Sequence, residues 1–122
     1  MKNKTVIIGA STNPARYAHI AAEMLTSYGH DIVPVGIKKG EVFGHPILDI
    51  RKQPAVEGVD TVTLYIGPVH QPEWYDYILR MKPRRVIFNP GTENPEFEKK
   101  VNDQGAEAIE ACTLVMLRTG QY

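Results

Sequence analysis

The side chains best suited to chemistry lie in a turn of small and polar residues that follows the first apolar run of the chain. Hydroxyl, amide and guanidinium groups in such a turn can donate hydrogen bonds to an anion. A helix that begins directly after the turn adds free backbone N–H groups and the positive end of its dipole. The sequence therefore predicts a phosphate-binding loop, and its members are Gly9, Ala10, Ser11, Thr12, Asn13, Pro14 and Arg16.

The same segment predicts where that helix begins. Gly9 permits a tight turn, and Pro14 suits the first position of a helix because its fixed φ fits there. We therefore expect the helix to start close to residue 14. Of the dinucleotide-binding pattern G-x-G-x-x-G only the first glycine is present, with Ser11 and Pro14 at the other two places. The alternative interpretation is a turn that serves only to connect a strand to a helix.

A second turn carries two adjacent lysines. The apolar run before it ends in Pro34, Val35 and Gly36, and Lys38 and Lys39 follow. Sites for NAD usually place an acidic residue at the end of the second strand, where it accepts hydrogen bonds from the ribose hydroxyls. Lysines in that place favour a ribose that carries an extra phosphate. The alternative is a solvated turn.

The sequence contains no clear catalytic constellation. Its four histidines fall on different predicted elements without metal-ligand spacing. The single cysteine, Cys112, follows the last predicted strand, and we interpret it as a buried, inert thiol. Glu93 follows the fourth predicted strand, where it is either a general base or a cap for the next helix.

Length and composition limit the classes of function. The 122 residues predict one domain, residues 1–122. With 14 basic and 14 acidic residues the net charge is zero, so the broad basic field of a nucleic-acid binder is absent. There is no apolar signal segment, and no apolar run has the length of a membrane span. One cysteine cannot form an internal disulfide, and the cytoplasm is the expected compartment.

Strand and helix patterns alternate along the chain, which is typical of a parallel sheet with helices on both faces. We expect an α/β fold of three layers, with five strands in a doubly wound order and the ligand above the carboxyl ends of the strands. Pro34 is expected near the end of its strand, because proline cannot donate to the sheet. The predicted strands are 5–8, 31–36, 60–66, 84–89 and 106–110; the helices are 14–28, 71–81, 95–103 and 112–118; and an irregular hairpin at 38–47 precedes a helical turn at 49–53.

Several segments together resemble a known family. They are the loop that starts at Gly9, the second strand at 32–35, Gly44-x-Pro46-Ile47, and Cys112 beyond the last strand. This arrangement resembles the small stand-alone CoA-binding proteins, which are single Rossmann-like domains similar to the CoA-binding domain of the succinyl-CoA synthetase alpha subunit. The resemblance implies that coenzyme A lies across the strand ends, with its pyrophosphate near residues 9–14 and its adenosine near the second and third loops.

The resemblance also assigns residues by position. Arg16 becomes a phosphate partner, and Lys38 or Lys39 falls where the synthetase domain uses a lysine on the coenzyme. The fourth loop departs from the Gln-x-Gly pattern of many relatives, and the synthetase domain that carries the phosphorylated histidine is absent, so ligase activity is not implied. The implied contacts of the later loops are Pro34, Val35 and Gly36, then Ile66, Gly67 and Pro68 on the adenine side, then Asn89, Pro90 and Gly91.

The sequence thus predicts a non-catalytic protein that binds coenzyme A or acyl-CoA. Two alternatives stay open: a small NADP- or nucleotide-dependent enzyme, and a subunit that docks on a larger acyl-CoA enzyme. A homodimer or a larger enzyme is the expected protein partner, with no nucleic acid, membrane or metal. The acyl group is not predicted.

Overall fold

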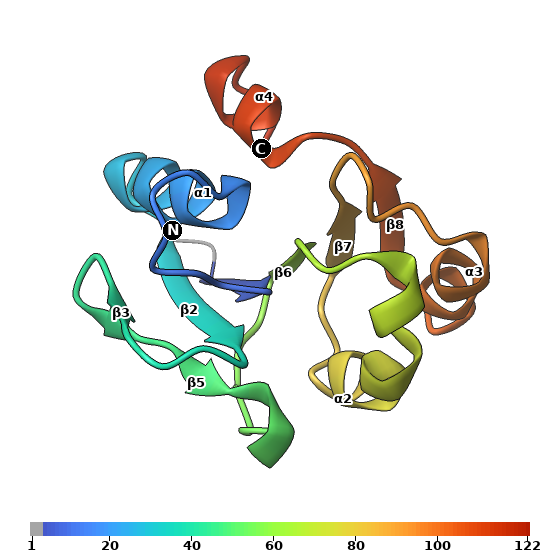
Figure 1. Cartoon of the computed structure of the whole chain (residues 1–122). Helices are drawn as coiled ribbons and strands as arrows, with labels where there is room; N and C mark the ends of the chain where they lie inside the picture. The colour runs from blue at the N-terminus through green and yellow to red at the C-terminus, as the bar shows by residue number, and fades with distance from the viewer. Residues whose placement is uncertain (1–3) are drawn as a thin grey trace.

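A parallel sheet of six strands forms the centre of the molecule, in the order β5-β2-β1-β6-β7-β8 (Figure 1). The computed structural model describes residues 4–122. Each strand pairs with its neighbours in parallel, and the central strands are apolar and buried, as expected for a sheet covered on both faces. The strands are β1 (Lys4–Ile8), β2 (Asp31–Gly36), β5 (Leu48–Asp49), β6 (Thr61–Leu64), β7 (Arg85–Phe88) and β8 (Glu107–Glu110).

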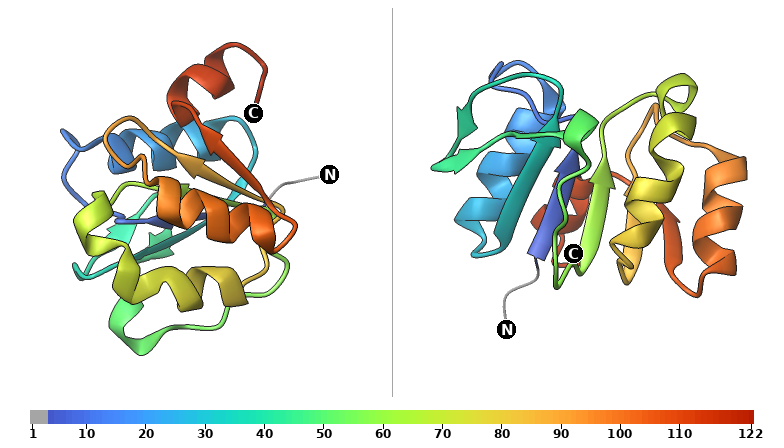
Figure 2. Two further views of the ribbon diagram at one scale, coloured as in Figure 1. Left: turned by 90° about the vertical axis from the view of Figure 1, so that its right-hand side faces the viewer. Right: turned by 90° about the horizontal axis from the view of Figure 1, so that it is seen from below.

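Helices cover both faces of this sheet (Figure 2). Side chains alternate along β1, so Ile7 packs with α1 (Tyr17–Ser27) and with Leu117 of α4 (Thr113–Arg118). Val6 and Ile8 point to the opposite face, where α2 (Tyr75–Arg80) and α3 (Pro95–Asp103) cover the sheet. The expected three layers are therefore present.

The prediction of five strands was wrong, because β5 adds a sixth at the edge of the sheet. It pairs only Leu48 with Val35 and Asp49 with Gly36, and a strand of two residues is too short to show a periodic pattern. Pro34 was also placed incorrectly: it lies inside β2, opposite Ile7. The carbonyl of Val35 faces β1, so the backbone nitrogen of Pro34, which has no hydrogen, faces the β5 side of the strand. The pairing with β5 begins only at Val35, so no hydrogen bond to β5 is lost at Pro34.

The first helix begins later than predicted, and Pro14 is not its first residue. Before the helix, Asn13 folds the chain into a turn: its side-chain oxygen accepts from the Ala15 N–H and its carbonyl accepts from the Arg16 N–H. Helix α1 then starts at Tyr17, with Arg16 in the N-cap position and no side-chain capping bond. Local cap signals therefore predicted the helix start three residues too early.

The other connections follow the sequence pattern more closely. The hairpin at 38–47 is confirmed, with β3 (Glu41–Val42) paired to β4 (His45–Pro46), and the turn at 49–53 contains a 3-10 helix (Ile50–Lys52). The helix predicted at 71–81 is shorter, because 3-10 turns at Pro68–His70 and Pro72–Trp74 precede α2.

Candidate functional site

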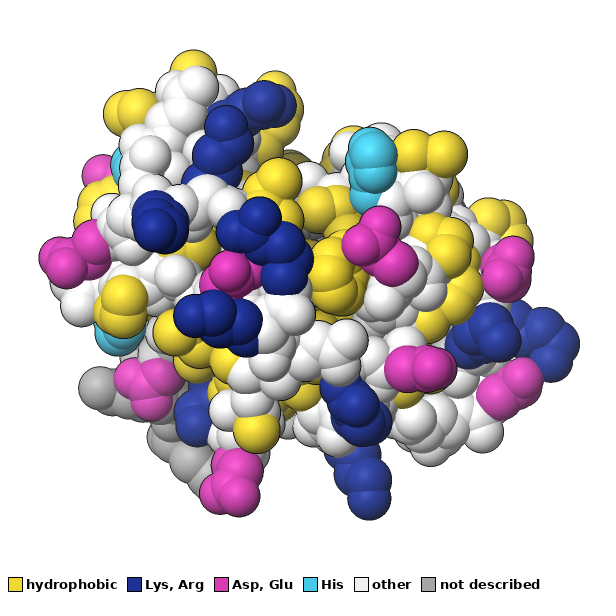
Figure 3. Space-filling model, turned by 60° about the horizontal axis from the view of Figure 1, so that its bottom comes forward, with side chains coloured by type: hydrophobic (Ala, Val, Ile, Leu, Met, Phe, Trp, Pro, Cys, Tyr) yellow, Lys and Arg dark blue, Asp and Glu magenta, His cyan; other side chains and the backbone are white. Residues whose placement is uncertain are grey.

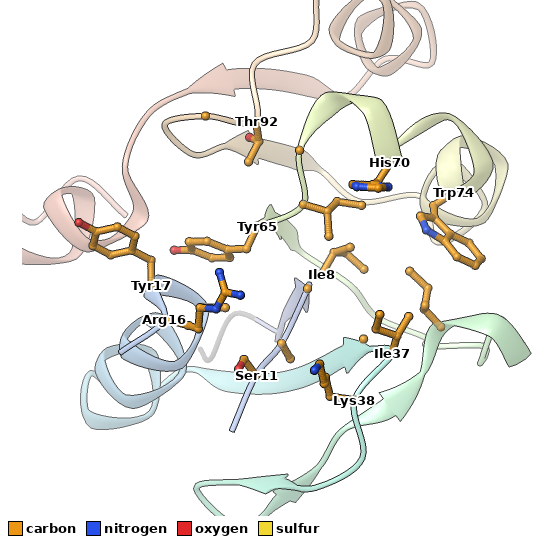
Figure 4. Close-up of a pocket in the computed structure, with 18 of the residues that line it drawn as sticks. Ile8, Ser11, Arg16, Tyr17, Ile37, Lys38, Tyr65, His70, Trp74 and Thr92 are labelled. Atoms are coloured by element: carbon orange, nitrogen blue, oxygen red, sulfur yellow. The ribbon is translucent and has the colours of Figure 1, made fainter. Parts of the chain in front are cut away.

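A cleft of about 840 Å³ opens above the carboxyl ends of β1, β2 and β6 (Figure 4). Strand order reverses between β1 and β6, so the loops after these two strands turn to opposite faces of the sheet. Such a crevice is where α/β sheets of this order bind ligands. Its volume lies in the usual range for small-molecule and cofactor sites, about 300 to 1,000 Å³.

The cleft collects residues from all four predicted loops. Arg16 and Lys38 enter it from the loops after β1 and β2, and Thr92 stands on the opposite side (Figure 4). The predicted site residues that line it are Gly9, Ala10, Ser11, Arg16, Gly36, Lys38, Ile66, Gly67, Pro90 and Gly91.

Other predicted site residues stand outside the cleft lining. Asn13 supports the first loop, because its N–H donates to Ser11 Oγ at 3.0 Å. Val35 holds the same loop through its carbonyl, which accepts from the N–H groups of Gly9 and Ala10. The predicted residues that do not line the cleft are Thr12, Asn13, Pro14, Pro34, Val35, Lys39, Pro68 and Asn89.

Asn89 joins the elements beneath the cleft. Its Nδ2 donates to Thr63 Oγ1 at 2.7 Å and to the Leu64 carbonyl at 2.9 Å, while its Oδ1 accepts from the Thr113 N–H at 2.9 Å. The side chain is buried, so these bonds satisfy polar groups that would otherwise be costly to bury. This residue therefore connects β6, the end of β7 and α4.

Two glycines let the loops approach one another. Gly9 has φ +94°, and a Cβ there would stand 3.1 Å from the carbonyl carbon and oxygen of Tyr65. A Cβ on Gly36 would stand 3.0 Å from the Ala10 carbonyl oxygen. The first loop is thus packed against the second and the third, and the absence of a side chain at both positions is a requirement of the fold.

The N-terminus of α1 faces the cleft with its amide groups available. Tyr17 and Ala18 line the cleft, and within residues 4–122 no hydrogen bond uses their N–H groups. Because no side chain caps this helix, its positive dipole end and free donors can serve a bound anion.

The charges around the cleft are unevenly distributed. Arg16, Lys38 and Arg51 lie on the side of the first two loops, and Glu73 lies beyond the third loop. Figure 3 shows Lys and Arg side chains gathered on one side of the hollowed surface. Arg51 is held by Asp49, with Nε at 2.9 Å from Oδ1. Hydrogen bonds from the side chain and the backbone N–H of Arg51 lower the pKa of the Asp49 carboxyl.

Several lining residues were not predicted as site residues. Trp74, from the predicted helix 71–81, both packs against the core and lines the cleft. Ile37 directly precedes the predicted contact Lys38. Arg51 and His70 lie in the 3-10 turns Ile50–Lys52 and Pro68–His70, and no local pattern predicts that these turns fold back over the cleft. The signal that could have found Tyr65 is its position directly before the predicted contacts Ile66 and Gly67.

Tyr65 forms part of the cleft wall with its hydroxyl buried behind it. That oxygen has no hydrogen-bond partner among the described residues. Burial raises the pKa of Tyr65 to about 12, so the phenol is neutral at physiological pH. A neutral, enclosed phenol supplies ring surface to the cleft and no charge.

The sequence left roles open for Cys112 and Glu93. Cys112 is half-buried at the N-cap of α4, outside the cleft lining. Glu93 accepts from the Gly91 N–H through Oε1 at 2.8 Å, and Asn94 caps α3 by accepting from the Phe97 N–H. Neither Cys112 nor Glu93 lines the cleft.

No cluster of three or more His, Cys, Asp or Glu side chains within residues 4–122 could hold a metal ion. No helix in the described part of the chain has the length and apolar character needed to cross a membrane.

The sheet order and the cleft over its carboxyl ends define an α/β ligand-binding domain. Comparison with protein families identifies which one: the model described as CoA binding domain matches residues 3–118. The chain therefore belongs to the CoA-binding domain family. The search of curated proteins gave no match.

Solved structures share the fold. A crystal structure of an uncharacterized protein is 53% identical with a TM-score of 0.96, over 100% of this chain and 99% of that one. A hypothetical protein from Pyrococcus horikoshii OT3 is 26% identical with a TM-score of 0.84, over 97% and 83% of the two chains. A protein from Thermus thermophilus is 23% identical with a TM-score of 0.86, over 99% and 91%, and shows the fold alone.

Proposed function

We propose that this chain is a Rossmann-like module that binds coenzyme A or acyl-CoA without catalysing a reaction on it. The observation that carries the proposal is the uncapped N-terminus of α1, which faces a cofactor-sized cleft beside Arg16. Membership of the CoA-binding domain family supports the choice of ligand.

The pyrophosphate would lie at the loop between β1 and α1. Free N–H groups at Tyr17 and Ala18, the Ser11 hydroxyl and the Arg16 guanidinium can all donate to phosphate oxygens from one side of the cleft. Arg16 suits this role because its planar fork can donate to two oxygens at once.

The adenosine end would lie toward the second and third loops. Ile37 and Trp74 offer apolar and aromatic surface for a base, and Ile37 is 60% exposed. Lys38 lines the cleft near this end, and the four residues directly after β2, 37–40, include no acidic side chain that could accept from an unmodified ribose. A phosphorylated ribose fits these residues better than the ribose of NAD.

The two alternatives predict different behaviour. A small NADP- or nucleotide-dependent enzyme would turn over a substrate with its cofactor. A docking subunit would co-purify with a larger acyl-CoA enzyme. Neither alternative has a specific observation in its favour. His70 and Glu73 line the cleft, and within residues 4–122 neither side chain hydrogen-bonds to a hydroxyl or thiol that could serve as a nucleophile.

Thermal unfolding tests the proposal, because a ligand that binds only the native state stabilises it. At a hundredfold excess over its Kd, CoA should add roughly 2.7 kcal/mol and raise the Tm by several degrees. Absence of any shift at millimolar CoA would contradict CoA binding. NADP is the comparison ligand, and a larger shift with NADP would favour the enzyme alternative.

A further inference from the structure

Two residues in the connection between β6 and α2 reverse the usual rule of burial. Gln71 is 0% exposed, whereas Val69, two positions earlier, is 82% exposed. Glutamine is mostly found at protein surfaces and valine inside, so a fully buried glutamine beside an exposed valine indicates a specific role for the amide. His70 and Trp74 line the cleft, and Gln71, which lies between them in the chain, does not. Its side chain therefore lies behind the cleft wall.

The side chain of Gln71 connects the third loop to the fourth. Its Nε2 donates to the Ile66 carbonyl at 3.0 Å and to the Thr92 carbonyl at 2.8 Å. Within residues 4–122 no other donor bonds to either carbonyl. Ile66 comes after β6 and Thr92 comes after β7, and both residues line the cleft. One buried amide thus joins two loops that are far apart in the sequence.

A second amide holds Gln71 in place. Asn94 Nδ2 donates to Gln71 Oε1 at 2.9 Å and to the Tyr75 hydroxyl at 2.8 Å, while Asn94 Oδ1 accepts from the Phe97 N–H. Tyr75 begins α2, and Asn94 is the N-cap of α3. Both amides therefore use their two N–H donors and their oxygen. A satisfied buried network favours one arrangement, because displacement leaves polar groups without partners.

The two walls of the cleft are thus built differently. The N-terminus of α1, Arg16 and Lys38 belong to the wall formed by the first two loops, and Thr92 stands on the opposite side (Figure 4). We propose that Gln71 is a positioning residue for the coenzyme, which fixes the third and fourth loops as one wall at a set distance from α1. This inference rests on the function proposed above. The loops contact the ligand, and Gln71 acts only through them.

Two ligands of different length separate this role from a general loss of stability. Coenzyme A would contact both walls, because its pyrophosphate would lie at α1 and its adenosine would reach Trp74. Inorganic pyrophosphate would contact the α1 side alone. Gln71→Met keeps the length of the side chain and removes its hydrogen bonds, so the Ile66 and Thr92 carbonyls lose a buried donor. The two loops would then separate until water reaches these carbonyls.

Calorimetric titration with CoA, together with amide chemical shifts for the weaker inorganic pyrophosphate, is the measurement. Gln71→Met should weaken CoA binding about tenfold and leave pyrophosphate binding unchanged. The control is Val101→Ala, which opens a cavity in the core near the C-terminal end of α3. This variant should lower the Tm and change neither affinity.

Three results would overturn the proposal. The first is equal CoA affinity in the wild type and Gln71→Met. The second is an equal loss of CoA affinity in Gln71→Met and Val101→Ala, because general destabilisation would then account for the effect. The third is a parallel loss of CoA and pyrophosphate binding in Gln71→Met, since the α1 side would then be disturbed as well.

Relaxation dispersion of the amide signals in the ligand-free chain tests the positioning role without the coenzyme. Gln71→Met should show exchange at residues 66–70 and 90–93 and none at 9–12 or 36–38. Unchanged relaxation at the first two segments would contradict the role of Gln71. A wild type that binds no CoA would instead contradict the proposed function, and the relaxation result would still stand.

A milder variant keeps the proposal testable if Gln71→Met does not fold. Tyr75→Phe removes only the hydroxyl that accepts from Asn94, at the far end of the network from the two loops. It should produce the same pattern of exchange and a smaller loss of CoA affinity, about threefold. Unchanged CoA affinity together with unchanged relaxation in Tyr75→Phe would then overturn the proposal.

Discussion

Arg16 combines a fixed charge with a position at the N-terminus of α1, and it is exposed. We predict that Arg16→Gln weakens CoA binding by about tenfold to a hundredfold, since a hydrogen bond to a charged group contributes about 1.5 to 3 kcal/mol. Stability should change little, because the side chain makes no hydrogen bond or ion pair with any residue of 4–122. Calorimetric titration measures the first effect and urea unfolding the second. Equal affinity in the variant would exclude Arg16 from the pyrophosphate position.

Lys38 and Lys39 follow β2 where a phosphorylated ribose would lie. We predict that the wild type prefers CoA to dephospho-CoA by roughly tenfold to thirtyfold, that salt weakens the preference, and that a Lys38→Ala, Lys39→Ala double variant binds both alike. Calorimetric titration of both proteins with both ligands is the measurement. Equal affinities in the wild type would mean that these lysines form a solvated turn.

At the scale of single residues, the sequence predicts those site residues whose type and place directly after a strand suggest a role. It predicts only some of the other residues that line the cleft. Gly9, Ser11, Arg16 and Lys38 stand in short loops directly after strands, so their position follows from the strand pattern. Arg51 and His70 depend on how longer connections fold back, which no local pattern determines.

At the scale of helices and strands, the hydrogen bonds of the Asn89 side chain connect β6 and the end of β7 to α4. We predict that Asn89→Ala lowers the free energy of unfolding by about 2 to 4 kcal/mol, because Thr63, Leu64 and Thr113 lose a buried partner. Urea unfolding is the measurement, with Glu93→Ala in the same loop as the exposed control. A loss no larger than that of the control would contradict the structural role.

The start of α1 shows why strands and helices were easier to predict than the turns that join them. Strands and helices were found from periodic burial, whereas the start of α1 was predicted from Pro14 and misplaced, because Asn13 forms its own turn first. Replacement of Gly9 would strain φ +94° and press a side chain on Tyr65, so it would disturb the fold together with any ligand. Arg16 is therefore the better position for testing the anion site.

At the scale of the whole molecule, stability should depend on pH through His30. Burial and the nearby Arg85 lower the pKa of His30, while Asp60 and Asp31 act in the opposite direction. Among the described residues its Nδ1 has no hydrogen-bond partner. The unfolded chain therefore binds this proton more readily than the native state. The contribution is complete above the unfolded value, about 6.5, and is lost as pH falls through the lower native value.

We predict that urea unfolding between pH 8 and pH 5 shows decreasing stability in the wild type and a smaller decrease in His30→Phe. The matched control is His45→Phe, since His45 lies in the small hairpin outside both core clusters. Equal slopes in the wild type and His30→Phe would show that His30 has the same pKa in the native and unfolded chains, and would contradict this prediction.

The outer strand β8 has a consequence for how copies of this chain meet. Its N–H groups alternate, and the one on Ala108 points away from β7 and donates to Asn102 Oδ1 of α3 at 3.2 Å. One donor of that edge is therefore already used within the chain and is not available to a strand from another molecule. Glu107 and Glu110 of this four-residue strand are both exposed, and charged side chains on a short edge strand disfavour pairing with another strand. Aggregation through an exposed sheet edge is discouraged at this strand by one amide side chain and two carboxylates.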